Sequence, residues 1–498
     1  MLTQLFGAGK PDHPFADLKE ARRILEALPA DEAKALEELA HWHESIAAAE
    51  GFRPEARLQA HALVDEAAQP RMRKLARDYL GAARPSRFQE NRMWTQAHEY
   101  WRQAGIAYAK CVDAVSQGAK GAEALKPQVP LLAARTLRAF AQQAKWLHLR
   151  YGPIDGSLWR TLLAVYAFAE SRGIADAKVA LYPGVPGETT PRLELVRALV
   201  LFSSSPYGLL PREVEHAERL IGELAASFAL VPSESQGASH WIDLAQGQPP
   251  QRLSRAPQAA PGLRYLVAGA ALAEIERMLQ RIEATRQIPP SLAGLGDQEV
   301  VVELLRHLAQ YWTSAGPERQ HPRHNVKSRL SIVHGLEAVM QVLDALEGAK
   351  PEAESWIVEN VSAGGFGAVV PQTKGDWLQI GRLIAMQPDG GNNWVVGMVR
   401  RVSKVSAQEA RVGIQTLSRA PELCTFSMRG SAEQGVLLPA PALGVGETAI
   451  ALKSGVFAGG QNLEAERGGR SYMYMPQGVS ERGEDYDLVR FREMVREA

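Results

Sequence analysis

Cysteine is scarce in this sequence of 498 residues, and its scarcity limits the chemistry that the chain can use. The two cysteines, Cys111 and Cys424, lie far apart in the sequence. Neither has a histidine or a second cysteine nearby at the spacing of metal ligands. We therefore predict two reduced, partly buried thiols and no metal site.

Net charge and long apolar runs are also absent. The 56 basic residues balance the 56 acidic residues, so the composition does not support broad attraction to nucleic acid polymers or anionic membranes. The longest apolar stretches, such as residues 265–273, are too short to cross a bilayer, and residues 1–15 do not resemble a secretory signal. With 46% hydrophobic and 22% charged residues, we expect a soluble, cytoplasmic protein without membrane insertion.

The short motifs that mark common enzyme sites do not occur in the sequence. There is no GxSxG, no HExxH, no Walker-type loop and no paired cysteine motif. The glycine-rich run at residues 364–367 does not complete a dinucleotide fingerprint, and a turn in a barrel explains it better. We predict no catalytic residue and no cofactor. An active site assembled from distant residues of the helical half is the alternative.

The first part of the chain, from about residue 15 to about 315, has the spacing of successive helices. Apolar residues recur at intervals of three and four over 18–28, 137–151 and 272–282, and proline or glycine follows the first two runs. We predict an all-α region over residues 1–314, made of one domain or of two packed subdomains. Residues 231–262 are rich in proline, glycine and serine, which predicts a long loop with a short strand pair around Trp241.

An aromatic-rich stretch within this region has two interpretations. Its spacing is helical, which favours a buried core, and a ligand-binding aromatic cluster is the alternative. The residues are Met93, Trp94, His98, Tyr100, Trp101 and Tyr108.

After about residue 325, valine, isoleucine, tryptophan and glycine replace alanine and leucine. Short β-prone runs separated by turn residues predict a small antiparallel barrel over residues 315–420. We expect strands at residues 356–358, 378–386, 394–402 and 412–417, with a hairpin turn at 389–392. Residues 421–498 are predicted to form a β-rich extension that ends in a helix over 486–496. The expected fold class is thus multidomain α+β.

The junction between the two parts carries a local excess of positive charge. Residues 319–329 contain four basic side chains that are always charged and no acid, within a chain of zero net charge. Pro322 disfavours a continuous helix, so the arginines are expected on an extended segment. The segment is either an anion-binding site or a solvated basic linker.

Two motifs stand in order across this junction. Residues 319–323 read RQHPR, an RxxxR pattern, and residues 360–365 read NVSAGG, an NxSxxG pattern. RxxxR before a β-barrel, followed by NxSxxG after its second strand, resembles the PilZ family, whose members bind cyclic di-GMP. The runs 380–383, 394–400 and 412–414 resemble the remaining strands of the family in order.

The resemblance implies a binding site for cyclic di-GMP. Arg319 and Arg323 would bind phosphate oxygens and guanine edges, because a guanidinium group bonds to both and also stacks on a purine. Asn360 and Ser362 would bond to guanine edges or orient the arginines. Gly365 would let the backbone approach the ligand.

The function that these observations favour is a cyclic di-GMP receptor, with the nucleotide as a regulatory ligand. Binding at the barrel would be coupled to the helical region, which would contact a protein partner. The alternative is a constitutive scaffold protein whose barrel no longer binds the nucleotide. Glu318 stands where some PilZ relatives have a basic residue that helps to hold a stacked ligand dimer. The sequence is therefore compatible with either one or two nucleotides per site.

Overall fold

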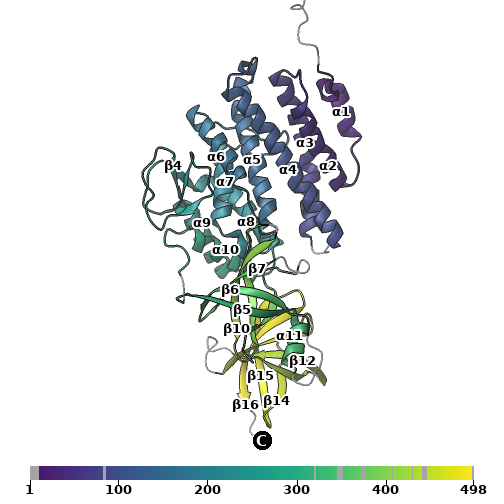
Figure 1. The fold of residues 1–498 in the computed structure, drawn as a ribbon, viewed down its shortest axis with the longest axis vertical. Coiled ribbons are helices and arrows are strands. Elements are labelled where there is room, and N and C mark those ends of the chain that lie inside the picture. Colours follow the sequence, from purple (N-terminus) through teal and green to yellow (C-terminus); the bar gives the residue numbers. More distant parts are fainter. Residues whose placement is uncertain are drawn as a thin grey trace, which may run out of the picture. The chain divides into compact units, whose positions relative to one another are not determined.

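The computed structural model describes residues 11–81, 86–318, 321–344, 351–371, 377–406, 408–428, 430–439 and 446–495. The chain divides into two compact units, one built mainly from residues up to Pro317 and the other mainly from Glu318 onward (Figure 1). Helices dominate the first unit, and two closed antiparallel barrels form most of the second. The predicted fold class, multidomain α+β, is confirmed.

Several helices of the first unit begin where the sequence supplies a capping residue. Asp17 accepts hydrogen bonds from the backbone N–H groups of Lys19 and Glu20, which the first turn of an α-helix leaves unpaired. The helices are α1 (Leu18–Glu26), α2 (Glu32–Ala48), α3 (Pro54–Leu80), α4 (Arg87–Ser116), α5 (Val129–His148), α6 (Gly156–Ser171), α7 (Pro191–Ser203), α8 (Pro211–Leu224), α9 (Gly269–Thr285) and α10 (Gln298–Trp312). None of the helices within the described ranges is both long and apolar enough to span a bilayer.

The core of this unit lies along α4, which packs lengthwise against α2 and α5 (Figure 1). Tyr100 and Tyr108 are fully buried in it, and Trp101 is 3% exposed. The interpretation of the aromatic-rich stretch as core is therefore right for these three residues. Their burial adds apolar surface to the packing of α4 against its neighbouring helices.

A small antiparallel sheet interrupts the helical unit. It contains β1 (Ala229–Val231), β2 (Ala238–Asp243), β3 (Gln251–Arg252) and β4 (Leu263–Val267) in the order β1-β4-β2-β3. Trp241 on β2 pairs with Gln251 and Tyr265, so the strand pair expected around Trp241 is present. The region is helical apart from this sheet, which is larger than the expected strand pair because β1 and β4 also pair across the irregular segment.

Three of the buried histidines in the helical unit are 1% exposed or less. His43 and His61 are fully buried with their Nδ1 atoms 3.1 Å apart, and His148 is 1% exposed beside Phe202. Burial lowers the pKa of His43 and of His148 to about 3 each. Burial, together with the nearby His43, also lowers the pKa of His61. All three side chains are thus neutral in the folded protein at neutral pH.

Acid is expected to destabilise the helical unit through these histidines. The pKa is lower in the folded state than the value of about 6.5 in the unfolded chain, so below pH 6.5 only the unfolded chain takes up the proton. The stabilisation is complete above pH 6.5, and it falls by about 1.4 kcal/mol per pH unit for each of His43 and His148 as the pH drops toward their folded-state pKa of about 3. Between pH 7 and pH 5, the free energy of unfolding should therefore fall by about 2 kcal/mol less in His148→Leu than in the wild type.

Urea unfolding of the full chain, followed by the helical signal in circular dichroism at both pH values, measures this difference. His41→Gln, which removes an exposed histidine from α2, is the control and should behave as the wild type. An equal loss of stability in His148→Leu and wild type would contradict the prediction.

The first barrel consists of six antiparallel strands in the closed order β10-β7-β6-β5-β8-β9. In β6, Trp356 and Val358 point into the barrel while Ile357 is 49% exposed, the alternation of a strand with one buried face. The bounds are β5 (His324–His334), β6 (Glu354–Ser362), β7 (Gly365–Pro371), β8 (Leu383–Pro388), β9 (Val395–Lys404) and β10 (Glu409–Ser418), with α11 (Leu336–Leu343) after β5. The predicted strands match β6, β8, β9 and β10, although β8 begins only at Leu383.

The C-terminal part forms a second closed barrel, in the order β11-β12-β13-β16-β15-β14. Its strands are β11 (Glu422–Met428), β12 (Ser431–Leu438), β13 (Glu447–Lys453), β14 (Leu463–Arg467), β15 (Arg470–Arg482) and β16 (Tyr486–Val495). The predicted helix over 486–496 was wrong, because most of this segment is β16. Pairing with β13 on one side and β15 on the other buries Leu488, Val489 and Phe491, and this outweighs the local preference for helix.

The two barrels share a hydrophobic core. Leu336 and Val339 of α11 are buried with residues of both barrels, among them Met398 of the first and Leu488 of the second. Polar contacts join the barrels at the edge of this core: Arg382 pairs with Glu484, Arg400 pairs with Glu481 at 2.7 Å, and the Tyr486 hydroxyl donates to the Gly381 carbonyl at 2.7 Å. Burial of this kind on both sides makes the two barrels one structural unit.

Candidate functional site

The NxSxxG motif forms the hairpin between β6 and β7. Asn360 and Ser362 lie at the end of β6, Ala363 and Gly364 form the turn, and Gly365 begins β7. Ser362 pairs with Gly365 across the turn, and its hydroxyl donates to the Gly365 carbonyl at 3.3 Å. The motif was predicted to follow the second strand of the barrel, and in the structure it spans the end of β6, the second strand, and the turn after it.

Gly365 lets two strands approach each other closely. A β-carbon on Gly365 would lie 1.9 Å from the carbonyl oxygen of Ile414 in β10, a distance that no real β-carbon contact reaches. The β7–β10 pairing continues to this point, where Gly365 is opposite Gln415, and the Thr416 N–H donates to the Gly364 carbonyl at 3.0 Å. The sequence suggested that Gly365 makes room for a ligand, but the close approach that it permits here is to β10.

Asn360 faces the outside of the barrel because of a bulge in β6. The β6–β7 register shifts between Val358, which is buried, and Asn360, which lies opposite Gly367. Gly367 faces outward, since the next residue, Ala368, is buried. The Asn360 Nδ2 atom would be 2.6 Å from a β-carbon on Gly367, so the amide lies over this glycine. The bulge therefore turns an amide outward that regular alternation would point into the core.

The basic segment reaches the same hairpin through the pairing of β5 with β6. His324 is opposite Val361 and Asn325 is opposite Asn360, which places Arg323 beside the Ser362 end of β6. Arg323 is exposed, and among the described residues no carboxylate forms an ion pair with it. The structure thus brings Arg323 to the NxSxxG motif, from which it is 37 residues distant in sequence. Arg319 lies outside the described residues.

Two further side chains meet at the turn and were not singled out as ligand-binding residues from the sequence. His321 Cδ2 would lie 3.0 Å from a β-carbon on Gly364, so its ring is beside the turn. Arg419, the first residue after β10, donates to the Ala363 carbonyl at 3.2 Å. No motif marks Arg419 in the sequence, and only the pairing of β10 with β7 brings it there.

The hairpin combines the groups needed to bind an anionic ligand with base edges. Guanidinium, amide, hydroxyl and imidazole groups lie at one end of the first barrel, on its outer surface. Guanidinium groups bind phosphate and the Hoogsteen edge of guanine, and amides and hydroxyls bond to base edges. In the described part of the chain, no cluster of three histidine, cysteine or acidic residues is placed to hold a metal ion.

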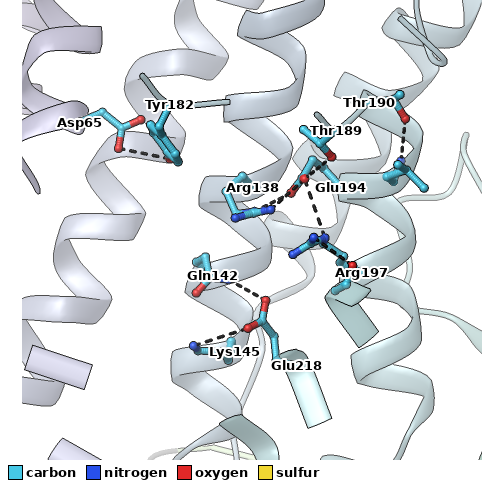
Figure 2. A network of polar contacts seen from close by, with 12 residues as sticks. Asp65, Arg138, Gln142, Lys145, Tyr182, Thr189, Thr190, Glu194, Arg197 and Glu218 are labelled. Carbon is cyan, nitrogen blue, oxygen red and sulfur yellow. Dashed lines mark hydrogen bonds and ion pairs between the residues drawn. The ribbon is translucent and has the colours of Figure 1, made fainter. Parts of the chain in front are cut away.

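A second polar cluster is buried among the helices (Figure 2). Glu194 of α7, with no exposed surface, accepts two hydrogen bonds from Arg138 of α5 at 2.5 and 2.8 Å and one from Thr189 at 2.6 Å. Burial raises the pKa of Glu194, but the positive charge of Arg138 outweighs it, and the net shift is downward. Lys145 of α5 pairs with Glu215 of α8 at 2.7 Å. These ion pairs join α5, α7 and α8, which is a structural role.

Comparison with models of protein families matches two regions of the chain. Residues 19–234 match the N-terminal domain of the cyclic-di-GMP receptor FimW, and residues 344–422 match the middle PilZ domain of the same receptor. Together the two matches cover more than half of the chain, and the second contains the β6–β7 hairpin. The resemblance to the PilZ family is thereby confirmed. No curated protein matches the chain significantly.

Proposed function

On the premise that this chain belongs to the FimW family of cyclic-di-GMP receptors and contains a PilZ domain, we propose that it binds cyclic di-GMP at the β6–β7 hairpin. One observation carries the proposal. The β5–β6 register brings the exposed Arg323 close to Asn360 and Ser362. Arg323 belongs to the RxxxR motif, and the other two residues belong to the NxSxxG motif. A guanidinium that no described carboxylate pairs with, beside outward-facing polar groups, is suited to a ligand with two phosphodiesters and two guanines.

Each side chain has a role that its chemistry supports. Arg323 binds a phosphate or the O6 and N7 atoms of a guanine with two N–H donors, and its plane stacks on a purine. Arg319, four residues earlier in the sequence, takes the same kind of role. The amide of Asn360 and the hydroxyl of Ser362 bond to the guanine edge or fix the orientation of Arg323. Gly365 holds the hairpin against β10 so that these groups stay in place.

The proposal includes coupling of the nucleotide to the helical unit. Residues 313–323 connect the end of α10 to the start of β5, and both motif arginines belong to this connection. A ligand that fixes the arginines to the barrel therefore also fixes the chain that leaves the helical unit, which is a known type of switch. The helical unit would then present or withdraw a surface for a protein partner.

Calorimetric titration of cyclic di-GMP into the purified chain, with GTP as the control ligand, tests the proposal. We expect saturable binding that weakens as salt is raised, because salt screens charges at an exposed site. Arg319→Ala and Arg323→Ala should each weaken binding by about ten- to a hundredfold, the cost of one bidentate arginine contact. Arg490→Ala, which removes an exposed arginine from β16, should leave binding unchanged.

The same samples test the coupling by small-angle X-ray scattering. Cyclic di-GMP should change the scattering profile of the wild type and leave that of Arg323→Ala unchanged at the same ligand concentration. Absence of any binding heat or thermal shift at ligand far above micromolar would refute the proposal, and the chain would then be better described as a constitutive scaffold.

A further inference from the structure

Arg419 occupies a distinctive position at the candidate site. It follows β10 directly, it is exposed, and its guanidinium donates to the Ala363 carbonyl in the turn of the β6–β7 hairpin. The Thr416 N–H bonds to the Gly364 carbonyl in the same turn, so the end of β10 is fixed against the hairpin. The backbone on both sides of the contact is thereby held in place.

The charge of Arg419 is not balanced in the way that the charges of several other arginines of this unit are. Arg382, Arg400 and Arg467 of the same unit each pair with a carboxylate. Across the described ranges, no carboxylate pairs with Arg419, whose one hydrogen bond to a carbonyl uses one of five guanidinium donors. An exposed guanidinium fixed by one bond, with donors left over, is prepared to bind an anion.

Arg419 and Arg323 lie on opposite sides of the same hairpin. The strand order β10-β7-β6-β5 puts Arg419 at the end of β10 and Arg323 at the start of β5. Three strand spacings separate them, about 14 Å measured along the sheet. His321 lies beside the turn between them. A ligand with two phosphodiesters can meet one arginine from each side.

We propose that Arg419 is a third arginine of the nucleotide site and binds a phosphodiester of cyclic di-GMP. The inference rests on the proposed function, because it assigns a further contact to the same ligand. Arg419 would keep its bond to the Ala363 carbonyl and offer its remaining donors to the phosphate oxygens. The phosphate contact would also explain why a positive charge that no described carboxylate pairs with lies at the turn.

Calorimetry with three substitutions separates the phosphate contact from the contact to Ala363. Arg419→Ala removes both, Arg419→Gln keeps a donor for the carbonyl but loses the charge, and Arg419→Lys keeps the charge but loses the planar fork. We expect Arg419→Ala and Arg419→Gln to bind cyclic di-GMP about tenfold more weakly than the wild type, with a smaller dependence on salt. The affinity of Arg419→Lys should lie between the affinities of these two variants and that of the wild type. The affinity of Arg490→Ala should equal that of the wild type.

The outcomes distinguish this inference from the proposed function. If the wild type binds and Arg419→Ala binds equally well with the same salt dependence, the inference is overturned and the proposed function stands. If Arg419→Gln restores the affinity of the wild type, Arg419 only positions the turn, and the phosphate contact is refuted. If the wild type itself does not bind, the proposed function fails. Thermal unfolding without ligand should show that all variants have the same unfolding temperature as the wild type.

Discussion

Gly365→Ala is expected to destabilise the first barrel by about 3 kcal/mol or more and to weaken cyclic di-GMP binding about a hundredfold. The added β-carbon would lie 1.9 Å from the Ile414 carbonyl oxygen. A backbone carbonyl within a paired strand cannot turn aside as a side chain can, so β7 must separate from β10 at Gln415. The hairpin would move with β7, and Asn360 and Ser362 would lose their places relative to Arg323. Loss of two hydrogen bonds of about 1–1.5 kcal/mol each accounts for the loss of affinity.

The adjacent glycine provides a matched control. A β-carbon on Gly364 would lie 3.0 Å from His321 Cδ2, a side-chain atom on an exposed residue that can rotate away. Gly364→Ala should therefore unfold close to the wild type and lose little affinity. Thermal and urea unfolding measure the stability of both variants, and calorimetry measures their affinity. Equal stability of Gly365→Ala and Gly364→Ala would show that the strands separate without cost, contrary to this account.

The division of the chain and the position of the hairpin were predictable because they depend on local patterns. Apolar spacings of three and four mark helices, and runs of β-branched residues between turn residues mark strands. The sequence around 360–365 combines a strand end with two glycines, which favours a turn. These features are set by residues close together in the chain, so one sequence is enough to find them.

The parts that were missed depend on contacts between distant residues. The segment 486–495 carries glutamate, arginine and methionine, which favour helix, and only pairing with β13 and β15 makes it a strand. Closure of the second barrel cannot be read from strand spacing alone. The helical region contains a sheet because Ala229 pairs with Val267 across a long irregular segment.

The site shows the same limit in its individual residues. The outward orientation of Asn360 depends on a bulge that the sequence does not predict. Val358 and Asn360 are two residues apart, so in a regular strand their side chains would point to the same face. Arg419 lies 54 residues from Gly365 and meets the turn only because β10 pairs with β7. Motif reasoning finds residues close to one another in sequence, and strand pairing adds those that are not.

The helical unit offers a test of how much burial decides the cost of losing an ion pair. Glu194 of α7 receives two hydrogen bonds from Arg138, and its side chain has no exposed surface. Asp176 receives two hydrogen bonds from Arg192, also of α7, at 2.7 and 2.8 Å, but its side chain is 70% exposed. The two pairs have nearly the same geometry, and their carboxylates differ strongly in exposure to water (the buried pair is drawn in Figure 2).

Glu194→Gln is expected to destabilise the helical unit by about 3–5 kcal/mol, because it removes the carboxylate that forms the hydrogen-bonded ion pair with the mostly buried Arg138. Asp176→Asn should cost less than about 1 kcal/mol, because water solvates Arg192 once its exposed partner is gone. Urea unfolding at pH 7, followed by the helical signal in circular dichroism, compares the two variants under one condition. The difference between the two losses of stability shows whether burial of the charge or the bidentate geometry decides the cost of breaking the ion pair.

A second substitution identifies the cause of the loss in Glu194→Gln. If the unpaired charge is responsible, adding Arg138→Met should recover a large part of the lost stability, since a buried apolar side chain needs no partner. If the loss comes from the hydrogen bond between Thr189 and Glu194, the double variant should be no more stable than Glu194→Gln alone. Equal costs for Glu194→Gln and Asp176→Asn would contradict the argument altogether, because the bidentate geometry that the pairs share would then decide their strength.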